Sequence, residues 1–167
     1  MSDIKKSEGR AAEDKPRYLE DFQVGERWVS SPTTLTEEEM VAYGIANDPQ
    51  PMHTNPELAK SGPFGGLIAS GWQIAALSMR VFVQSGGYGK TPVIGMGIDE
   101  LRWRKPVRPG DVLTVEREVV EIIRSKSQPD RGIIRTQVSV RNQLGEVVMT
   151  LLTLGRVPVR PAATAGA

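Results

Sequence analysis

The stretch "LIASGWQIAALSMRVFVQ" at residues 67–84 is apolar on nearly every side when it is drawn as a helix. It is too short and carries too many polar residues for a comfortable membrane span, so it predicts a helix buried inside a domain. Ser70 is placed to cap this helix, with Gly71 in its first turn, and "SGGYG" at 85–89 predicts its end. The rest of the chain must therefore cover this helix.

The residues after the helix show the patterns of β-strands. Apolar residues alternate at Ile94, Met96 and Ile98 and then change parity to Leu101 and Trp103, which predicts a strand with a bulge between 98 and 101. "NQLG" at 142–145 predicts a hairpin turn. Further segments rich in Val, Ile, Leu and Thr predict strands: 112–123, 132–141 and 146–157.

The residues before the helix predict one strand over 26–34 and a shorter helix within "TLTEEEMVAYGIAND" at 34–48. Thr36 can cap that helix, and the acidic residues 37–39 suit the positive end of its dipole. The order of elements predicts an α+β fold in which an antiparallel sheet is wrapped around one long central helix. We expect a single domain over 17–158, with disordered tails at 1–16 and 159–167.

Composition excludes several classes of protein and site. The 167 residues contain 21 Lys+Arg and 20 Asp+Glu, which argues against a protein built to coat nucleic acid. The chain has no cysteine and one histidine, which excludes disulfides, thiolate zinc sites and most histidine-based metal sites. From these counts we expect no metal. The N-terminus is charged and lacks the apolar core of a secretory signal, so we expect a cytoplasmic protein with no membrane association.

The one histidine, His53, follows Asp48 by five positions in "DPQPMH" at 48–53, and two prolines stiffen the path between them. An imidazole can exchange protons near neutral pH, and Asp48 could hold the same water molecule. We expect apolar surroundings to raise the affinity of Asp48 for a proton. Backbone N–H groups at the start of the long helix could stabilise negative charge, with Gly71 as the donor. Two simpler interpretations stay open: Asp48 only orients the histidine, and Gly71 only permits close packing.

"DPQPMH", followed by "FGGLIASGW" at 64–72 and "LRWRKPVRPGD" at 101–111, resembles the MaoC-like dehydratases, which are relatives of the (R)-specific enoyl-CoA hydratases. The resemblance covers nearly all of the chain and implies the hot-dog fold. It also implies that Asp48 and His53 are the catalytic pair and that Gly71 is the oxyanion donor. The implied reaction is hydration of a trans-2-enoyl-CoA, or dehydration of an (R)-3-hydroxyacyl-CoA, with coenzyme A as part of the substrate and no separate cofactor.

Two positions depart from the family pattern: Gln50 stands where Asn is commoner, and Ser70 where many members have His. We predict substrate-binding roles for these two residues and three others, and for Ser70 a helix cap is the favoured role. The basic residues of 102–108 could hold the phosphates of coenzyme A, although the alternation of a strand would place Arg102 and Arg104 on a solvated face. Trp72 and Phe82 are predicted to lie in the core. The predicted substrate-binding residues are Gln50, Phe64, Gly65, Ser70 and Arg104.

Two other functions stay open. A hot-dog thioesterase generally places a carboxylate on or near the central helix, but residues 67–84 contain no Asp or Glu, which argues against this activity. A non-catalytic acyl-CoA-binding module would keep the pocket without turnover. The uncovered apolar side of the central helix and the free sheet edge, together with the resemblance, predict a homodimer or a higher homo-oligomer.

Overall fold

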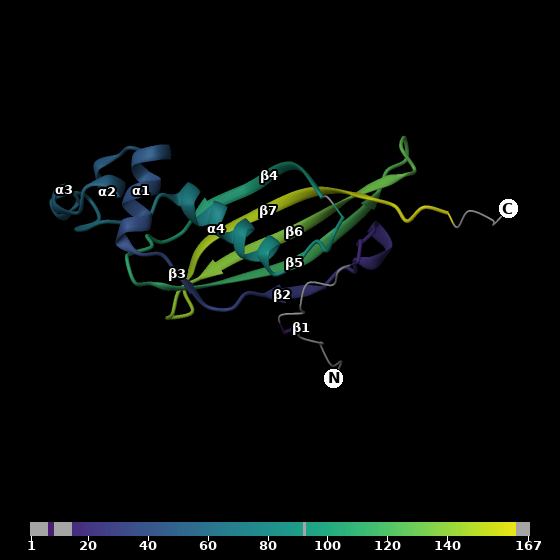
Figure 1. Ribbon diagram of the computed structural model, residues 1–167, viewed down its shortest axis with the longest axis horizontal. Coiled ribbons are helices and arrows are strands. Elements are labelled where there is room, and N and C mark those ends of the chain that lie inside the picture. Colours follow the sequence, from purple (N-terminus) through teal and green to yellow (C-terminus); the bar gives the residue numbers. More distant parts are fainter. Residues whose placement is uncertain (1–6, 9–14, 92, 163–167) are drawn as a thin grey trace.

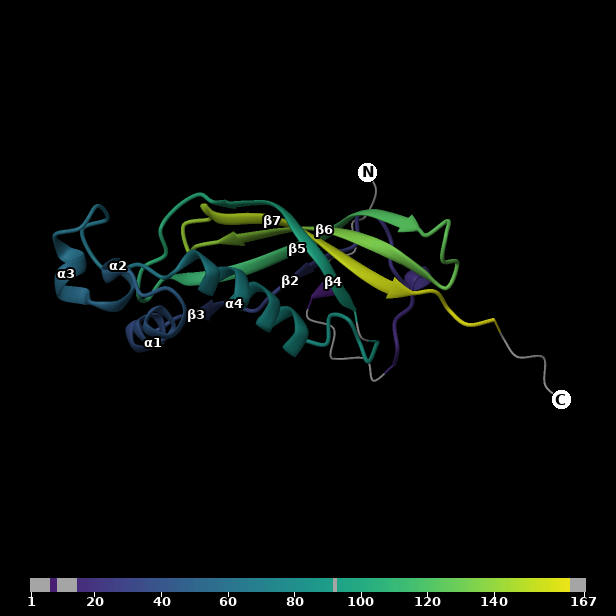
Figure 2. The ribbon, with the colours of Figure 1, turned by 90° about the horizontal axis from the view of Figure 1, so that it is seen from above.

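The computed structural model describes residues 7–8, 15–91 and 93–162, and over these residues the chain forms one sheet with a long helix against one face (Figures 1 and 2). Seven strands occur in the order β1-β2-β5-β6-β7-β4, with β3 pairing to β5 outside this path. The helical elements are a 3₁₀ turn at Leu19–Asp21, α1 Glu37–Asn47, α2 Pro51–Thr54, α3 Pro56–Lys60 and α4 Gly71–Gln84. The strands are β1 Ser7–Glu8, β2 Arg27–Val29, β3 Thr33–Thr34, β4 Ile94–Trp103, β5 Val112–Arg124, β6 Arg131–Arg141 and β7 Val147–Pro158.

The long strands β4, β5, β6 and β7 confirm the prediction made from the alternating pattern. Every second residue of β6 is buried, as expected for a strand with one face on the core. In β4 the pairing with β7 shifts between Asp99 and Arg102, and Glu100 has a positive φ of 54°, so the predicted bulge is present. The switch of the apolar residues from even to odd positions therefore corresponds to a β-bulge in the backbone.

The prediction of one strand over 26–34 was wrong, because β2 and β3 are separate. Both pair antiparallel with β5, but the residues between them include Pro32, which has no N–H to donate to a sheet. Ser30 lies in the segment between β2 and β3 and still forms hydrogen bonds with β5. Its backbone N–H donates to the Val115 carbonyl at 2.9 Å, and its hydroxyl accepts the Val115 N–H at 3.0 Å.

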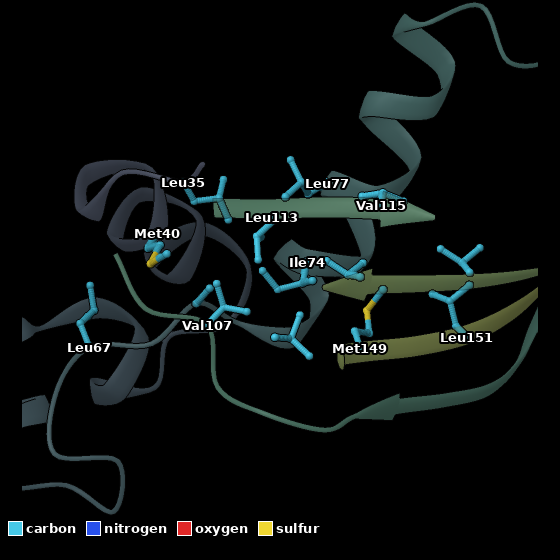
Figure 3. Packing of buried hydrophobic residues seen from close by; sticks show 14 of the residues in the cluster. Leu35, Met40, Leu67, Ile74, Leu77, Val107, Leu113, Val115, Met149 and Leu151 are labelled. Atoms are coloured by element: carbon cyan, nitrogen blue, oxygen red, sulfur yellow. The ribbon is translucent and has the colours of Figure 1, made fainter. Parts of the chain in front are cut away.

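Helix α4 buries one side against the sheet and leaves the other side uncovered. Ile74 and Leu77 pack in one cluster with Leu113, Val115 and Met149 of the strands (Figure 3). The predicted central helix is thus confirmed. Phe82 is buried as expected, but the prediction that Trp72 lies in the core was wrong, since 53% of its surface is exposed. Met79 and Val83 are also exposed, so this side of the helix is apolar and open.

Helices α1, α2 and α3 extend beyond one end of the sheet (Figures 1 and 2). Thr36 caps α1 as predicted: its hydroxyl accepts the Glu39 N–H at 3.1 Å, and the Glu39 carboxylate accepts the Thr36 N–H at 2.9 Å. Met40 anchors α1 in the core beside Leu67 and Val107 (Figure 3). The connection between α1 and α4 is therefore held against the end of the sheet.

The predicted tails at 1–16 and 159–167 lie largely outside the described residues, so the domain boundaries stay predictions. Within the first of these ranges, Ser7–Glu8 pairs in parallel with β2. In the part of the chain that the structure describes, no helix combines the length and apolar character needed to cross a bilayer.

Candidate active site

Asp48 and His53 lie on either side of the junction between α1 and α2. Asp48 ends α1, where its backbone N–H donates to the Gly44 carbonyl at 2.9 Å. Pro51 is the first residue of α2, where a missing N–H costs nothing, and the His53 N–H donates to the Gln50 carbonyl at 2.8 Å. The short, proline-stiffened turn therefore brings both side chains to one place.

Gly44 allows α1 and α2 to approach each other at this junction. A Cβ atom on Gly44 would lie 2.5 Å from the carbonyl oxygen of His53, which is far inside contact distance. The position of the histidine backbone thus depends on a glycine four residues before Asp48. The sequence pattern gave no reason to single out this glycine.

The environment of His53 fixes which ring nitrogen carries the proton of the neutral form. The residue is only 4% exposed, and its Nδ1 lies 2.9 Å from the carbonyl oxygen of Ile68. A carbonyl can only accept, so Nδ1 must donate and carry a proton. Nε2, which lies 3.3 Å from Oδ2 of Asp48, is therefore the nitrogen that can gain or lose a proton. Nothing in the sequence pattern pointed to the Ile68 carbonyl.

Two side-chain donors hold the Asp48 carboxylate. The Gln50 amide donates to Oδ1 at 2.8 Å, and the Ser70 hydroxyl donates to Oδ2 at 2.7 Å. The bonds from Gln50 and then Ser70, with a smaller contribution from His53, lower the pKa of Asp48, although burial acts in the opposite direction. The expectation that apolar surroundings raise its proton affinity was wrong, because the donors outweigh desolvation. Asp48 is therefore ionised at neutral pH.

Ser70 occupies the residue before α4, as predicted, but its side chain does not cap the helix. Its fully buried hydroxyl bonds to Asp48 instead, so the predicted capping role was wrong. This bond holds the Asp48 carboxylate at Ser70, the residue that precedes Gly71. The first N–H groups of α4 have no acceptor within the helix, and they present positive potential next to the pair.

The indole of Trp103, the last residue of β4, packs directly against Gly71. A Cβ atom on Gly71 would come within 2.3 Å of the Trp103 ring, so the packing interpretation of this glycine is supported. Trp72 packs edge-on against Trp103, with ring centroids 5.4 Å apart. The two half-exposed tryptophans thus form an aromatic wall over the start of α4. Sequence analysis treated Trp103 only as a strand residue.

The other predicted substrate-binding residues lie in exposed positions. Phe64 and Gly65 belong to the loop between α3 and α4, and the guanidinium of Arg108 donates to the Phe64 carbonyl. Arg104 is exposed just beyond β4, where its backbone N–H donates to the Val148 carbonyl at 2.8 Å. Arg108, rather than Arg104, therefore contacts the loop that leads to α4. Substrate binding by these residues stays a prediction.

Comparison with known proteins places this site in a family. The model of the MaoC like domain matches residues 21–142, which is most of the chain. The chain belongs to the MaoC-like dehydratase family. A MaoC-like dehydratase from Rhodospirillum rubrum shares 43% sequence identity with this chain and superposes with a TM-score of 0.81 over 87% of this chain and 99% of its own.

One further relative supports the family, and one solved structure supports the fold. A 3-hydroxybutyryl-CoA dehydratase from Methylorubrum extorquens is 30% identical over 149 residues, covering 87% of each chain. The (R)-hydratase from A. caviae superposes with a TM-score of 0.68 over 82% of this chain and 98% of its own, and at 24% identity this likeness shows the fold alone. The predicted hot-dog fold and the family resemblance are confirmed. Within the described residues, no three His, Cys, Asp or Glu side chains gather as metal ligands.

Replacing Gly44 with alanine should disturb the Asp48–His53 pair without removing either member. The added methyl group collides with the His53 backbone, so α1 and α2 must separate. We expect a loss of about 1–3 kcal/mol in the free energy of unfolding, measured by urea denaturation. We also expect kcat/KM for the reaction catalysed at this site to fall by about 100-fold, because small displacements of reacting groups are costly. Ala42→Ser, which adds one atom on the exposed face of α1, should leave both quantities nearly unchanged.

Removing either donor to Asp48 should shift the acid limb of the pH profile. A lowered pKa keeps the carboxylate ionised, and this form is lost as the pH falls through that pKa. Gln50→Leu and Ser70→Ala should therefore raise the pKa of Asp48 and move the acid limb of kcat/KM to higher pH. Gln50→Leu should cause the larger shift.

Ser85→Ala serves as the control for this pH experiment, because the Ser85 hydroxyl donates to the Phe82 carbonyl at the other end of α4. Its profile should match that of the unchanged protein. An acid limb that stays in place in both Asp48-donor variants would show that Asp48 does not govern it.

Proposed function

We propose that this MaoC-like domain catalyses the reversible addition of water to a trans-2-enoyl-CoA, which in reverse is the dehydration of an (R)-3-hydroxyacyl-CoA. The observation that carries the proposal is the approach of His53 Nε2 to within 3.3 Å of an ionised Asp48 carboxylate, beside the start of α4. A relative named as a 3-hydroxybutyryl-CoA dehydratase supports the choice of an acyl-CoA substrate.

In the proposed hydration step, Asp48 and His53 hold one water molecule between them and the substrate. The water oxygen forms a bond to C3, and Nε2 takes one of its protons. Because Nδ1 is already protonated against the Ile68 carbonyl, the ring becomes an imidazolium that the Asp48 carboxylate stabilises. The imidazolium Nε2 then gives this proton to C2, where the electron pair of the former double bond forms the new C–H bond. The atoms of one water are thus added across the double bond, and the site returns to its starting protonation state.

The electrons of the C2=C3 bond move toward the thioester oxygen while the C–O bond forms. The Gly71 N–H, at the positive end of α4, is the proposed donor to that oxygen. The absence of a side chain at Gly71 lets the Trp103 indole lie against the helix start, and the thioester is proposed to approach the Gly71 N–H from another side. Gly71 then serves as a packing residue and as an oxyanion donor together.

This reaction needs no separate cofactor. Hydration moves only protons and one electron pair, so no redox group takes part, and coenzyme A enters as part of the substrate. Hydrolysis of the thioester is the competing reaction at such a site. Helix α4 carries no Asp or Glu, so a carboxylate on the central helix cannot activate water for that hydrolysis.

The decisive experiment follows the absorbance of the conjugated thioester during incubation with trans-2-enoyl-CoA substrates of several chain lengths, while free thiol is measured in parallel. We expect absorbance loss without thiol release. Asp48→Asn and His53→Ala should each lower kcat by between about 100- and 10,000-fold, since each removes a proton-handling group. Asp130→Asn, on an exposed turn, makes the same chemical change and should leave kcat unaffected. Thiol release would identify a thioesterase, and binding without turnover at every chain length would identify an acyl-CoA-binding module.

We further propose that the domain forms a homodimer through the edge of β4. This strand ends the sheet order, so one side of its backbone has no neighbouring strand among the described residues. Its exposed residues Ile94, Met96 and Ile98 are apolar, as are Trp72 and the other uncovered residues of α4. An unpaired edge next to a continuous apolar surface is typical of an interface. A second copy that pairs along β4 would extend the sheet and cover this surface.

Light scattering coupled to size-exclusion chromatography tests the dimer. The unchanged protein should have twice the 18.3 kDa mass of the chain. Ile98→Lys places a charge on the β4 surface and should give a monomer, whereas Val120→Lys, an equally large change at an exposed apolar residue of β5, should not. A mass of one chain for the unchanged protein would contradict the proposal.

A further inference from the structure

Among the residues that the structure describes, Arg117 is a buried cation with no acidic partner. It lies in β5, between Trp28 of β2 and Val138 of β6, and is 3% exposed. Its Nη2 donates to the Tyr88 hydroxyl at 3.2 Å and to the Thr153 hydroxyl at 3.4 Å. Its Nε and Nη1 are buried without a hydrogen-bond partner, and it takes part in no ion pair given by the described residues.

The contacts that Arg117 does make cannot balance its charge. Its guanidinium carbon lies 4.1 Å from the centre of the Phe82 ring, and such a cation–π contact offsets only part of the cost of removing the group from water. Burial lowers the pKa of Arg117, which is the expected effect on a cation with no anion beside it. Buried charges in proteins are normally paired, so the unpaired guanidinium requires a physical explanation.

A cavity of about 30 Å³ adjoins Arg117 near the C-terminal end of α4. Three arginines and one glutamate line it: Arg17, Arg27, Arg117 and Glu26. Arg17 pairs with Glu26 at 2.8 Å, and Arg27 pairs with Glu118 at 2.8 Å. The charge of Arg117 is therefore the excess, and one negative charge would balance it. A volume of this size holds one water-sized group or a few atoms.

We propose that this cavity binds a small monoanion, either a halide or a carboxylate as small as formate, which pairs with the guanidinium of Arg117. The site lies at the other end of α4 from Asp48 and His53, and it is independent of the catalytic proposal. Charge balance favours a monoanion over a dianion. The size of the cavity favours an ion of one to three heavy atoms over a larger organic acid.

Thermal unfolding at constant ionic strength tests this proposal. In one series sodium chloride replaces sodium gluconate, and in a second series sodium formate does so. Gluconate is the reference salt because its anion is also a monocarboxylate but is too large for the cavity. The melting temperature should rise with a saturable dependence, by about 4 °C when the anion reaches about 20 times its dissociation constant. Arg117→Met should abolish the rise. Arg141→Met, which removes a guanidinium paired with Glu116 at 3.1 Å on the adjacent strand, should retain it.

Crystals of the unchanged protein grown with sodium bromide give a readout that depends on no variant. An anomalous bromide peak beside the Arg117 guanidinium is expected. A flat melting temperature in both series would show that water, and no anion, solvates Arg117, and would overturn the proposal. A rise that persists in Arg117→Met would place the anion elsewhere. A bromide peak without a saturable rise would mean an adventitious ion only, and would also count against the site.

Discussion

The hydrogen bond from the Ser70 hydroxyl to Asp48 joins two segments of the chain, each of which is positioned by its own contacts. Asp48 ends α1, whose position is set by the Thr36 cap and by Met40 in the core, while Ser70 precedes α4, which packs on the sheet. At 2.7 Å, the bond involves a charged acceptor and a fully buried donor, and such bonds are among the stronger ones in proteins. The geometry of the site follows from it, because it places a carboxylate, an imidazole and a helix start in contact.

The same bond also sets the electrostatics of the pair. Together with the Gln50 amide, it keeps Asp48 ionised beside Nε2 of His53. The Ile68 carbonyl meanwhile fixes the proton on Nδ1. In the proposed reaction, the two groups therefore have different roles: Asp48 stays charged, and Nε2 of His53 takes and returns the proton. The two departures from the family pattern, Gln50 and Ser70, are the residues that produce this division.

The sequence predicted those features that depend on local pattern. Helix α4, the alternating strands, the bulge in β4 and the Thr36 cap all follow from the periodicity and chemistry of nearby residues. Most of the features that it missed depend on contacts between distant residues, whereas the interruption between β2 and β3 at Pro32 has a local cause. Ser70 is a good cap by residue type, yet a carboxylate 22 positions earlier in the chain competes for its hydroxyl. The pKa of Asp48 moves in the opposite direction from the expected one because the Gln50 amide, two residues away, and then the distant Ser70 hydroxyl donate to the carboxylate. The exposure of Trp72 depends on which side of α4 the sheet covers, and an almost entirely apolar helix does not reveal that side.

The aromatic wall connects the candidate site with the uncovered apolar surface. Trp72 and Trp103 pack against each other at the start of α4, and both are about half exposed, as are Ile94, Met96 and Ile98 of the strand that ends at Trp103. Because Gly71 has no side chain, the Trp103 indole can lie close to the helix start and exclude water from the side of the proposed oxyanion donor. Any partner that covers the β4 surface would border this same wall. In the proposed reaction and the proposed dimer, the same two tryptophan side chains therefore border both the Gly71 N–H and the subunit contact, so replacing either tryptophan should alter both.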